Sequence, residues 1–429
     1  MVSSTPKSVS IIGASVGGLT LGLVLKKHGI QPRFFELREP GYDFGGAMSL
    51  TPNALRVLDT IGAYSRIKPH GYNFEAMTFL TDVHHEVTGK LYFGQKDVYG
   101  YDSIRITRKV IIQELRQMAE EAGIEINYGK KFTKIISEDA DSVEWEFADG
   151  SREKDGMLIG ADGLHSKVRS YLFPDVRPHY SGFIGLTYCF PRSNWEHLEE
   201  TFPLPCSIRG EQGSFIITPQ TQGGKEIFVG RQLKFEERKD RSGWSSLLEN
   251  KDELIGILQK DPSAWTPLLQ AAQAQVSTPE AHFLNVWPFY TIPEMDHWHS
   301  PTHGRVLILG DAAHAIPPSA GQGANQAFED SHSLGMLLTK LDSKVDLLGA
   351  LQVWEEYRMR RMVEVLRLTN RLMTLRMTEE ERASMPEDLK WELDWKNDAG
   401  KAQLGWLYNV DIDRDVQTLV ETLHAQGTP

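Results

Sequence analysis

The segment Gly304–Asp330 constrains the fold more strongly than any other part of the chain. Its apolar run Val306–Leu309 predicts a short buried strand, which stops at Gly310-Asp311 and so places a carboxylate just past the strand end. Pro317-Pro318 then imposes an extended turn, and Gly321-Gln-Gly323 leaves backbone N–H groups uncovered immediately before an expected helix. Such a turn suits phosphates or electron-rich ring atoms, because the N–H groups and the helix dipole point outward together. The carboxylate instead suits a sugar hydroxyl, so the segment predicts a site for a dinucleotide with a polyol linker.

A second glycine-rich turn lies near the start of the chain. Val9–Ile12 predicts a strand, Gly13-Ala-Ser15-Val-Gly17-Gly18 a turn into a helix, and Arg33–Leu37 a second strand that carries Glu36. This is the βαβ opening of a dinucleotide-binding fold, in which the acid accepts hydrogen bonds from the adenosine ribose. Ser15 stands where the fingerprint has its middle glycine, the residue that lets the pyrophosphate approach closely. We therefore expect the phosphates to shift slightly or the Ser15 hydroxyl to contact them.

A third motif, Met157–Arg169, again ends an apolar strand in Gly-Ala-Asp162-Gly163 and starts a helix at Ser166. From about Val9 to the helix after Asp330, the chain resembles the FAD-dependent aromatic hydroxylases (class A flavoprotein monooxygenases), including salicylate hydroxylase-like and tetracycline-destructase-like members. The resemblance implies that FAD is bound by residues of these motifs, of the loop at Gly46 and of the helix start at Arg108. The implied cofactor residues are Gly13, Ser15, Gly18, Glu36, Arg38, Gly46, Arg108, Asp162, Gly163, Asp311, Pro318, Gly321, Gly323, Ala324 and Asn325.

The resemblance also implies an α/β fold, in which a Rossmann-like FAD-binding domain carries an inserted antiparallel β-sheet substrate domain and C-terminal helices. We expect the FAD-binding domain at 1–175 and 296–345, with a strand near 72–100 contributed to the other domain. The substrate domain is expected at 176–295 and the helical region at 346–429. Strand-like runs at Gly182–Phe190, Ser207–Pro219, Glu226–Phe235 and Asn285–Tyr290 support the inserted sheet.

For chemistry, the resemblance implies a monooxygenase that consumes NADPH or NADH as a transient electron donor. Oxygen would add to the reduced flavin, and the C4a-hydroperoxide would hydroxylate or epoxidise an aromatic or polyketide-like small molecule, with the protein orienting the substrate and excluding water. Two alternatives stay open: a flavin-dependent oxidase or dehydrogenase without oxygen insertion, and a non-catalytic flavin- or ligand-binding protein. No metal site is expected.

The substrate residues are sought on the strands of the inserted sheet. Arg209 and Tyr188 are candidates for helping a phenol ionise, which would raise the nucleophilicity of its ring. Side-chain alternation places Leu186 and Tyr188 on one face of their strand, and Phe228 with Gly230 on one face of another. These residues and Phe289 are the candidate substrate contacts. Which face looks toward the flavin is left open by the sequence.

Composition narrows the partners. A net charge of −12 argues against general nucleic-acid binding, and two cysteines provide no disulfide framework. No signal peptide or membrane span is apparent, so we expect a cytoplasmic enzyme, monomeric or homodimeric, whose partners are a small molecule and O2. The basic helix at Leu351–Met377 is expected to pack across both domains rather than to lie on a membrane.

Overall fold

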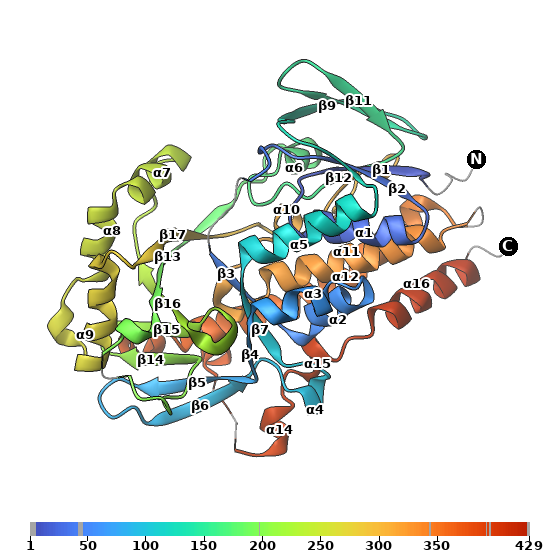
Figure 1. Cartoon of the computed structure of the whole chain (residues 1–429). Coiled ribbons are helices and arrows are strands. Elements are labelled where there is room, and N and C mark those ends of the chain that lie inside the picture. Colours follow the sequence, from blue (N-terminus) through green and yellow to red (C-terminus); the bar gives the residue numbers. More distant parts are fainter. Residues whose placement is uncertain are drawn as a thin grey trace.

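A computed structural model of the chain describes residues 6–41, 46–196, 198–342, 345–391, 393 and 396–426. Two sheets dominate it: a five-stranded sheet and a seven-stranded sheet, with helices packed around both (Figure 1). The α/β class with a separate, largely antiparallel sheet is therefore confirmed.

The five-stranded sheet is parallel throughout, in the order β18-β12-β1-β2-β8. Successive side chains of a strand face opposite sides of the sheet. Phe34 accordingly packs on Gly22 of one helix, whereas Phe35 packs on Trp145 and Phe147 of the strands across the other face. The sheet is thereby buried on both sides, as parallel sheets require. Its strands are β1 (Ser8–Ile12), β2 (Gln31–Phe35), β8 (Glu125–Asn127), β12 (Leu158–Gly160) and β18 (Val306–Ile308).

Helices α1, α5 and α11 lie together on one face of this sheet (Figure 1). Close packing of α1 on α11 depends on a missing side chain, because a Cβ on Gly335 would stand 2.5 Å from Cγ1 of Val24. A small antiparallel sheet, β9-β10-β11, covers the other face. These elements are α1 (Val16–Lys27), α5 (Arg108–Glu121), α11 (Gly323–Lys340), β9 (Phe132–Glu138), β10 (Val143–Phe147) and β11 (Arg152–Asp155).

The seven-stranded sheet has the order β17-β13-β16-β15-β14-β5-β6 and is antiparallel except between β14 and β5. The run at 207–219, expected as one strand, is a hairpin of β14 and β15, because residues 211 and 212 form a turn. Strand β5 joins this sheet from the early part of the chain. The strands are β5 (Ala76–Thr81), β6 (Val87–Tyr92), β13 (His179–Pro191), β14 (Cys206–Gly210), β15 (Gly213–Pro219), β16 (Glu226–Lys234) and β17 (His282–Thr291).

One face of the seven-stranded sheet is sealed by three helices that the sequence reasoning did not predict: α7 (Arg241–Glu249), α8 (Lys251–Leu258) and α9 (Pro267–Ala274). Their apolar side chains and those of the sheet form a second core, separate from the core of the parallel sheet. Figure 1 shows these helices on the far side of the sheet from α1 and α11. The opposite face of the sheet is therefore the one that can face the parallel sheet.

The remaining elements join the two parts. A three-stranded sheet, β3-β7-β4, lies between them, and the C-terminal helices pack along α11. The basic run expected at 351–377 is largely one long helix, α12. The elements are β3 (Ala47–Leu50), β4 (Tyr72–Phe74), β7 (Ser103–Thr107), α2 (Pro52–Thr60), α3 (Tyr64–Ile67), α4 (Lys96–Tyr99), α6 (Lys167–Leu172), α10 (Asp311–His314), α12 (Leu347–Thr374), α13 (Glu379–Ala383), α14 (Asp398–Lys401), α15 (Gly405–Tyr408) and α16 (Ile412–Gln426).

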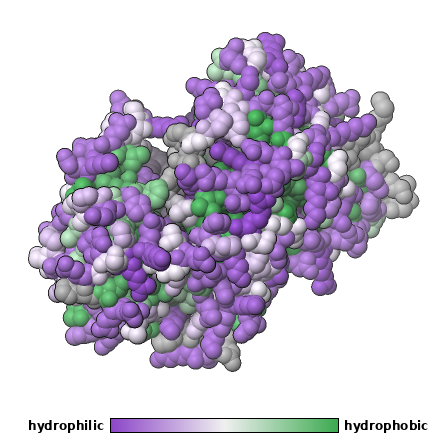
Figure 2. Space-filling model, viewed as in Figure 1, coloured by the Kyte–Doolittle hydropathy of each residue, from purple (hydrophilic) through white to green (hydrophobic). Residues whose placement is uncertain are grey.

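Figure 2 shows that hydrophilic residues dominate the viewed surface and that apolar residues form only scattered patches on it. Among the described residues, no helix combines the length and apolarity that a membrane span requires.

A buried ionic network ties α12 to α11. The Arg358 guanidinium is fully buried and donates to Glu329 at 2.7 Å and to Asp330 at 2.7 Å. Asp330 also accepts from His314 at 2.6 Å and from the backbone N–H of Gly310 at 2.9 Å. Burial opposes ionisation of Asp330, but His314 and Arg358 outweigh it and lower its pKa to about 2. The network therefore stays charged and fixes the backbone just before Asp311.

We predict that Arg358→Met lowers the free energy of unfolding by about 3–5 kcal/mol, because it leaves two buried carboxylates without their cation. Urea unfolding measures this change. Arg360→Met is the matched control, since Arg360 lies on the same helix with an exposed Glu356 as its partner, and its effect should stay within about 0.5 kcal/mol. Equal effects of the two substitutions would contradict the assigned role of Arg358.

Candidate active site

The predicted cofactor residues gather at one edge of the parallel sheet. Gly13, Glu36, Asp162 and Asp311 each follow the carboxyl end of a strand, namely β1, β2, β12 and β18. These four strands are neighbours in the order β18-β12-β1-β2. In open parallel sheets, ligands bind in the crevice outside the carboxyl ends of the strands. The topology therefore brings together residues up to 298 positions apart in sequence (13 to 311).

The β1–α1 turn is shaped by its glycines. Gly13 has φ +104°, and a Cβ there would meet the Ala161 carbonyl oxygen at 2.5 Å. A Cβ on Gly18 would stand 2.2 Å from the Gly13 carbonyl oxygen. Ser15 fits this turn as the N-cap of α1: its hydroxyl accepts from the Gly18 N–H at 3.5 Å and donates to the Ala161 carbonyl at 3.2 Å. Serine at the middle position is therefore accommodated with an ordinary extended backbone (φ −84°).

Glu36 stands just past β2 and holds the same turn from the other side. Its carboxylate accepts from the Ala14 N–H at 2.8 Å and from the Arg38 N–H at 3.0 Å. The Glu36 side chain remains half-buried. This placement suits the predicted contact with a ribose, because a carboxylate can accept further hydrogen bonds through its remaining lone pairs.

The Asp162 loop carries a polar atom that lacks a partner. Asp162 Oδ2 accepts from the Lys167 N–H at 2.7 Å, whereas Oδ1 is buried and makes no hydrogen bond within the described residues. Burial raises the pKa of this carboxyl. Arg169 links the loop to the Asp311 segment, since its guanidinium donates to the carbonyls of Leu164 at 2.6 Å and Ala312 at 2.9 Å. The two acidic loops are thus held side by side.

The Pro318–Gly321 turn precedes helix α11. A short 3-10 turn spans Pro318–Ala320, Gly321 is left-handed with φ +63°, and α11 begins at Gly323. Gly323 and Ala324, the first two residues of α11, are half-buried. Asn325, by contrast, is committed to the protein, because its amide donates to the carbonyls of Ser49 at 2.9 Å and Gly321 at 2.5 Å.

Arg108 and Gly46 meet at the start of α5. The Arg108 N–H donates to the Gly46 carbonyl at 3.0 Å, and Arg108 Nε is buried with no hydrogen-bond partner among residues 6–41 and the other described ranges. Gly46 has φ +107°, and a Cβ there would contact the ring of Trp287 at 3.1 Å. The loop at Gly46 is therefore where the cofactor residues meet the seven-stranded sheet. The neighbouring Gly45 lies outside the described residues.

These features fit FAD. Two buried polar atoms, Asp162 Oδ1 and Arg108 Nε, have no hydrogen-bond partner among the described residues, and the glycine turn at Gly13 and Gly18 leaves no room for a side chain. A dinucleotide with hydroxyl and phosphate groups supplies hydrogen-bonding partners of both kinds.

The open face of the seven-stranded sheet carries aromatic side chains. Phe228 and Thr187 lie beside Gly230 on this face, as the contacts of a Cβ on Gly230 show. Phe289 and Trp287 lie beside Gly185 on the same face. Arg105, from β7, places its guanidinium 4.5 Å from the centre of the Phe228 ring. This face therefore lines the space next to Gly46, and Phe228, Gly230 and Phe289 stand where substrate contacts are proposed.

The prediction for Leu186 and Tyr188 is wrong. Both are buried in the core between the seven-stranded sheet and helices α7, α8 and α9, on the opposite face. The Tyr188 hydroxyl donates to the Ala272 carbonyl at 2.9 Å, and burial raises the pKa of this phenol far above its ordinary range. Leu186 and Tyr188 do share one face of β13, as strand alternation predicts. That face is the one covered by α7, α8 and α9, so Tyr188 is a core residue.

Arg209, the other candidate catalytic residue, does lie on the open face, because it follows Ile208, which is buried in the sealed core, and successive side chains of a strand alternate between faces. It lines a cavity of about 460 Å³ between β5, β14 and the segment after α12, together with Ser207 and Leu375. Arg209 stands two strands from the Phe228 strand in the sheet order β16-β15-β14.

Three further residues near the site escaped the sequence reasoning: Arg105, Trp287 and Arg376, whose Nη2 donates to the Ser319 carbonyl in the Pro318–Gly321 turn at 2.9 Å. Arg105 sits in the alternating run Ser-Ile-Arg-Ile-Thr, where Ile104 and Ile106 are buried in the core. An arginine between two core positions of a strand was a usable signal. The sequence around Trp287 and Arg376 gave no such signal. Trp287 is brought to the site by the folding of β17 into the sheet, and Arg376 by its place just after α12.

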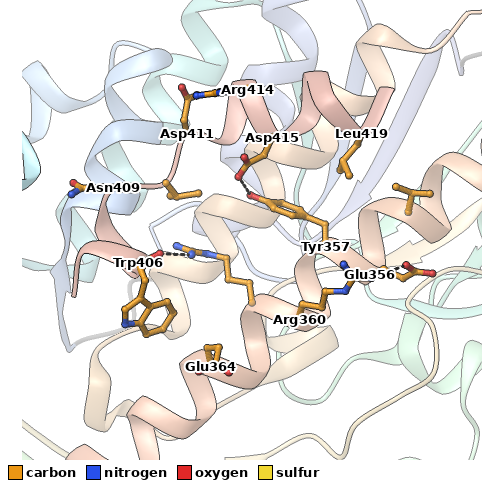
Figure 3. Close-up of a pocket in the computed structure, with 13 residues that line it drawn as sticks. Glu356, Tyr357, Arg360, Glu364, Trp406, Asn409, Asp411, Arg414, Asp415 and Leu419 are labelled. Carbon is orange, nitrogen blue, oxygen red and sulfur yellow. Dashed lines mark hydrogen bonds and ion pairs between the residues drawn. The ribbon is translucent and has the colours of Figure 1, made fainter. Parts of the chain in front are cut away.

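A second cavity, of about 810 Å³, lies between α12, α15 and α16 (Figure 3). Charged side chains from these helices surround it, and the Tyr357 hydroxyl donates to Asp415 at 3.0 Å. None of the predicted cofactor or substrate residues lines this cavity. It is therefore separate from the site at the edge of the parallel sheet.

Comparison with known proteins agrees with this geometry. A family model described as "FAD binding domain" matches residues 7–344. Hispidin-3-hydroxylase of Neonothopanus nambi is 26% identical over 387 residues, covering 82% of this chain and 85% of the relative. The 6-hydroxynicotinate 3-monooxygenase of Bordetella bronchiseptica is 25% identical over 373 residues, covering 86% and 92%. The solved structure of CtdE in complex with FAD and substrate 4 has the same fold, with a TM-score of 0.77 at 21% identity, covering 98% of this chain and 99% of that one.

The fold and the dinucleotide cradle define a flavoprotein that uses FAD. The chain belongs to the FAD-dependent aromatic hydroxylase family.

We predict that Gly18→Ala weakens FAD binding by about tenfold or more, because the new methyl group collides with the Gly13 carbonyl and distorts the turn. Flavin fluorescence titration measures the dissociation constant. Gly256→Ala is the control, since a Cβ there meets nothing within 4 Å. Unchanged affinity in Gly18→Ala would contradict the placement of FAD at this turn.

We also predict that Tyr188→Phe leaves kcat and KM unchanged and lowers stability by about 1 kcal/mol through one lost buried hydrogen bond. Phe228→Ala should raise KM about tenfold by removing an apolar wall of the substrate space. Steady-state kinetics with any substrate that supports turnover distinguishes the two. A large kinetic effect of Tyr188→Phe would restore the rejected assignment.

Proposed function

We propose that this FAD-dependent monooxygenase takes electrons from NADPH or NADH and hydroxylates or epoxidises an aromatic or polyketide-like small molecule. The observation that carries the proposal is the pairing of two surfaces. The candidate FAD residues and the aromatic face of the seven-stranded sheet come together at Gly46, where an added Cβ would stand 3.1 Å from the Trp287 ring. A planar substrate bound against Phe228 would thus lie next to the cofactor.

When bound and reduced, FAD supplies the activation of oxygen. The chain's own residues perform the remaining tasks. Glu36, Asp162 and Arg108 hold the cofactor, Phe228 and Trp287 confine the ring of the substrate, and the sealed core behind the sheet keeps this wall rigid. Excluding water from this space favours transfer of oxygen to the substrate over loss of the activated oxygen.

The relatives support the substrate class. Their names describe hydroxylation of hispidin and monooxygenation of 6-hydroxynicotinate, which are ring compounds. For this chain we propose a ring compound of the same general class, together with O2, as its partners. We further propose that it works in the cytoplasm as a monomer or homodimer; the two buried free thiols, Cys189 and Cys206, are consistent with a reducing compartment.

The test is NADPH and NADH oxidation by the FAD-loaded protein across a panel of phenols, aromatic acids and polyketides, with peroxide and products quantified. The proposal predicts that at least one compound stimulates oxidation, yields little peroxide and gives a product one oxygen atom heavier. A compound that is dehydrogenated, with all consumed oxygen recovered as peroxide, would instead establish the oxidase alternative. Flavin that neither nicotinamide reduces, with or without ligand, would contradict the proposed electron donor.

A further inference from the structure

Three side chains of the kinds that bind transition metals come together at one end of the seven-stranded sheet. They are Cys189 on β13, Glu226 at the start of β16 and His282 at the start of β17, and the three strands are neighbours in the order β17-β13-β16 (Figure 1). The Cys189 Sγ, a Glu226 carboxylate oxygen and a His282 ring nitrogen all lie within 4.8 Å of one another. Sulfur, nitrogen and oxygen donors of these kinds are the ligands of Zn²⁺ in proteins.

The cluster lies on the open face of the sheet. Cys189 pairs with Phe228 across β13 and β16, and paired residues of an antiparallel sheet share a face. Cys189 is 1% exposed, yet within the described residues it belongs to neither of the two hydrophobic cores. Cys206, by contrast, is part of the sealed core. The two cysteines of the chain therefore have different surroundings, and only Cys189 stands beside polar side chains that can bind a metal ion.

A β-bulge brings His282 to Cys189. Thr187 of β13 pairs with Asn285 of β17, and the next pair is Cys189 with His282, so two steps along β13 match three along β17. In an unbroken strand, position 283 would stand opposite Cys189, and His282 would project from the sealed face. The extra residue is accommodated by Phe283, whose φ is +53°. Because Phe283 is 44% exposed, the bulge does not serve to bury it, and its consequence is the placement of His282.

Both nitrogens of the His282 ring face oxygen atoms that accept hydrogen bonds. Nδ1 lies 2.9 Å from the Glu280 carbonyl oxygen, which can only accept, so Nδ1 carries a hydrogen. Nε2 lies 2.8 Å from a Glu226 carboxylate oxygen. A neutral ring would present a lone pair to this carboxylate, so a proton or a metal ion is required between the two atoms. Histidines that bind metal through one nitrogen commonly donate the other N–H to a backbone carbonyl, as Nδ1 does here.

The position of Cys189 favours a metal ion over a proton. A proton would satisfy His282 and Glu226 alone and would leave the nearby sulfur without a role. A nucleophilic Cys–His pair does not fit either, because it needs a ring nitrogen directed at the sulfur. The two nitrogens of His282 are directed at Glu280 and Glu226 instead. A metal ion is the occupant that uses all three side chains.

Size and charge agree with Zn²⁺. In a tetrahedral zinc site with bonds of about 2.0–2.3 Å, the ligand atoms stand about 3.3–3.8 Å apart, so small side-chain rotations suffice to close this cluster around the ion. A thiolate and a carboxylate together neutralise a divalent cation. The side chains of His282 and Glu226 are 39% and 22% exposed, which gives the ion a path from solvent and leaves a fourth position for water.

We propose that Cys189, Glu226 and His282 bind one Zn²⁺ ion, with water as the fourth ligand. Binding displaces the thiol proton of Cys189 and the proton between His282 and Glu226, and both protons pass to the solvent. The ion joins the ends of β13, β16 and β17, and this role does not depend on the proposed oxygenation. The ligands come from three separate strands and form no spaced motif, which is why no metal site is expected from the sequence.

The test uses Co²⁺, which replaces Zn²⁺ in such sites and reports its ligands through its absorbance. The FAD-loaded protein is treated with a chelator, dialysed and titrated with Co²⁺, and the flavin spectrum is subtracted. We expect a single equivalent to produce the charge-transfer band of a Co²⁺–thiolate bond and the intense visible bands of tetrahedral cobalt, and Zn²⁺ to abolish both. Absence of the thiolate band would overturn the proposal and leave His282 and Glu226 as an ion pair only.

Variants assign the metal to these ligands. Cys189→Ser should remove the thiolate band, and His282→Ala should weaken Zn²⁺ binding by more than about 100-fold, beyond the effect of losing an outer-shell partner. Competition with a chromogenic zinc chelator measures the affinity. The controls Cys206→Ser, in the sealed core, and His179→Ala, exposed at the other end of β13, should keep both the band and the affinity. A thiolate band that survives in Cys189→Ser, or unchanged affinity in His282→Ala, would overturn the assignment.

Glu226→Gln tests the site without changing a buried residue, so it remains informative if a variant of Cys189 fails to fold. It keeps the size of the side chain but removes the negative charge, and it should weaken Zn²⁺ binding by about tenfold or more. Glu280→Gln is the matched control, because it removes an equal charge from an exposed neighbour that contacts His282 only through its backbone carbonyl. Equal losses of affinity in the two variants would contradict a direct bond between Glu226 and the metal.

Discussion

The buried pairing of Arg358 with Glu329 and Asp330 is the interaction on which the cofactor edge depends. It joins the long C-terminal helix α12 to α11, and through Asp330 it reaches His314 and the backbone of Gly310. Glu329 also accepts from Arg361 and from the Asn53 amide, which stands in α2. Because every carboxylate here has a cation, the network satisfies the main condition under which buried charges are tolerated. Because Asp330 accepts from the Gly310 N–H, this network holds the backbone next to Asp311 in place.

A second constraint is the division of the seven-stranded sheet into a sealed and an open face. Helices α7, α8 and α9 cover the first and leave the second to meet the cofactor edge. Strand alternation then decides the role of each side chain, so neighbours along one strand serve unrelated purposes. Tyr188 is core, whereas Thr187, one position earlier, faces the space beside Phe228. The guanidinium that lies over the Phe228 ring comes from outside this sheet, from Arg105 of β7.

The cofactor edge could be predicted from the sequence because each part of it is local. Gly13, Asp162 and Asp311 follow apolar runs that are strands in the structure, and the glycines stand where a side chain would collide with backbone. The wall of the substrate space could not be predicted in the same way. Alternation sorted Leu186, Tyr188, Phe228 and Gly230 into faces, but the orientation of those faces is set by α7, α8 and α9, which are distant in sequence. Arg376 reaches the site only because α12 is long enough to cross both parts of the molecule.

The most direct test of this account is a crystal structure of the protein with FAD. Asp162 Oδ1 and Arg108 Nε, which have no hydrogen-bond partner within the part of the chain that the structure describes, are predicted to gain hydrogen bonds, directly or through water, to the pyrophosphate and polyol part of the cofactor. The flavin ring is predicted to lie between the Gly46 loop and the Pro318–Gly321 turn, facing Phe228. FAD bound in the cavity between α12, α15 and α16, or bound at the sheet edge with both Asp162 Oδ1 and Arg108 Nε still unpartnered, would contradict the account.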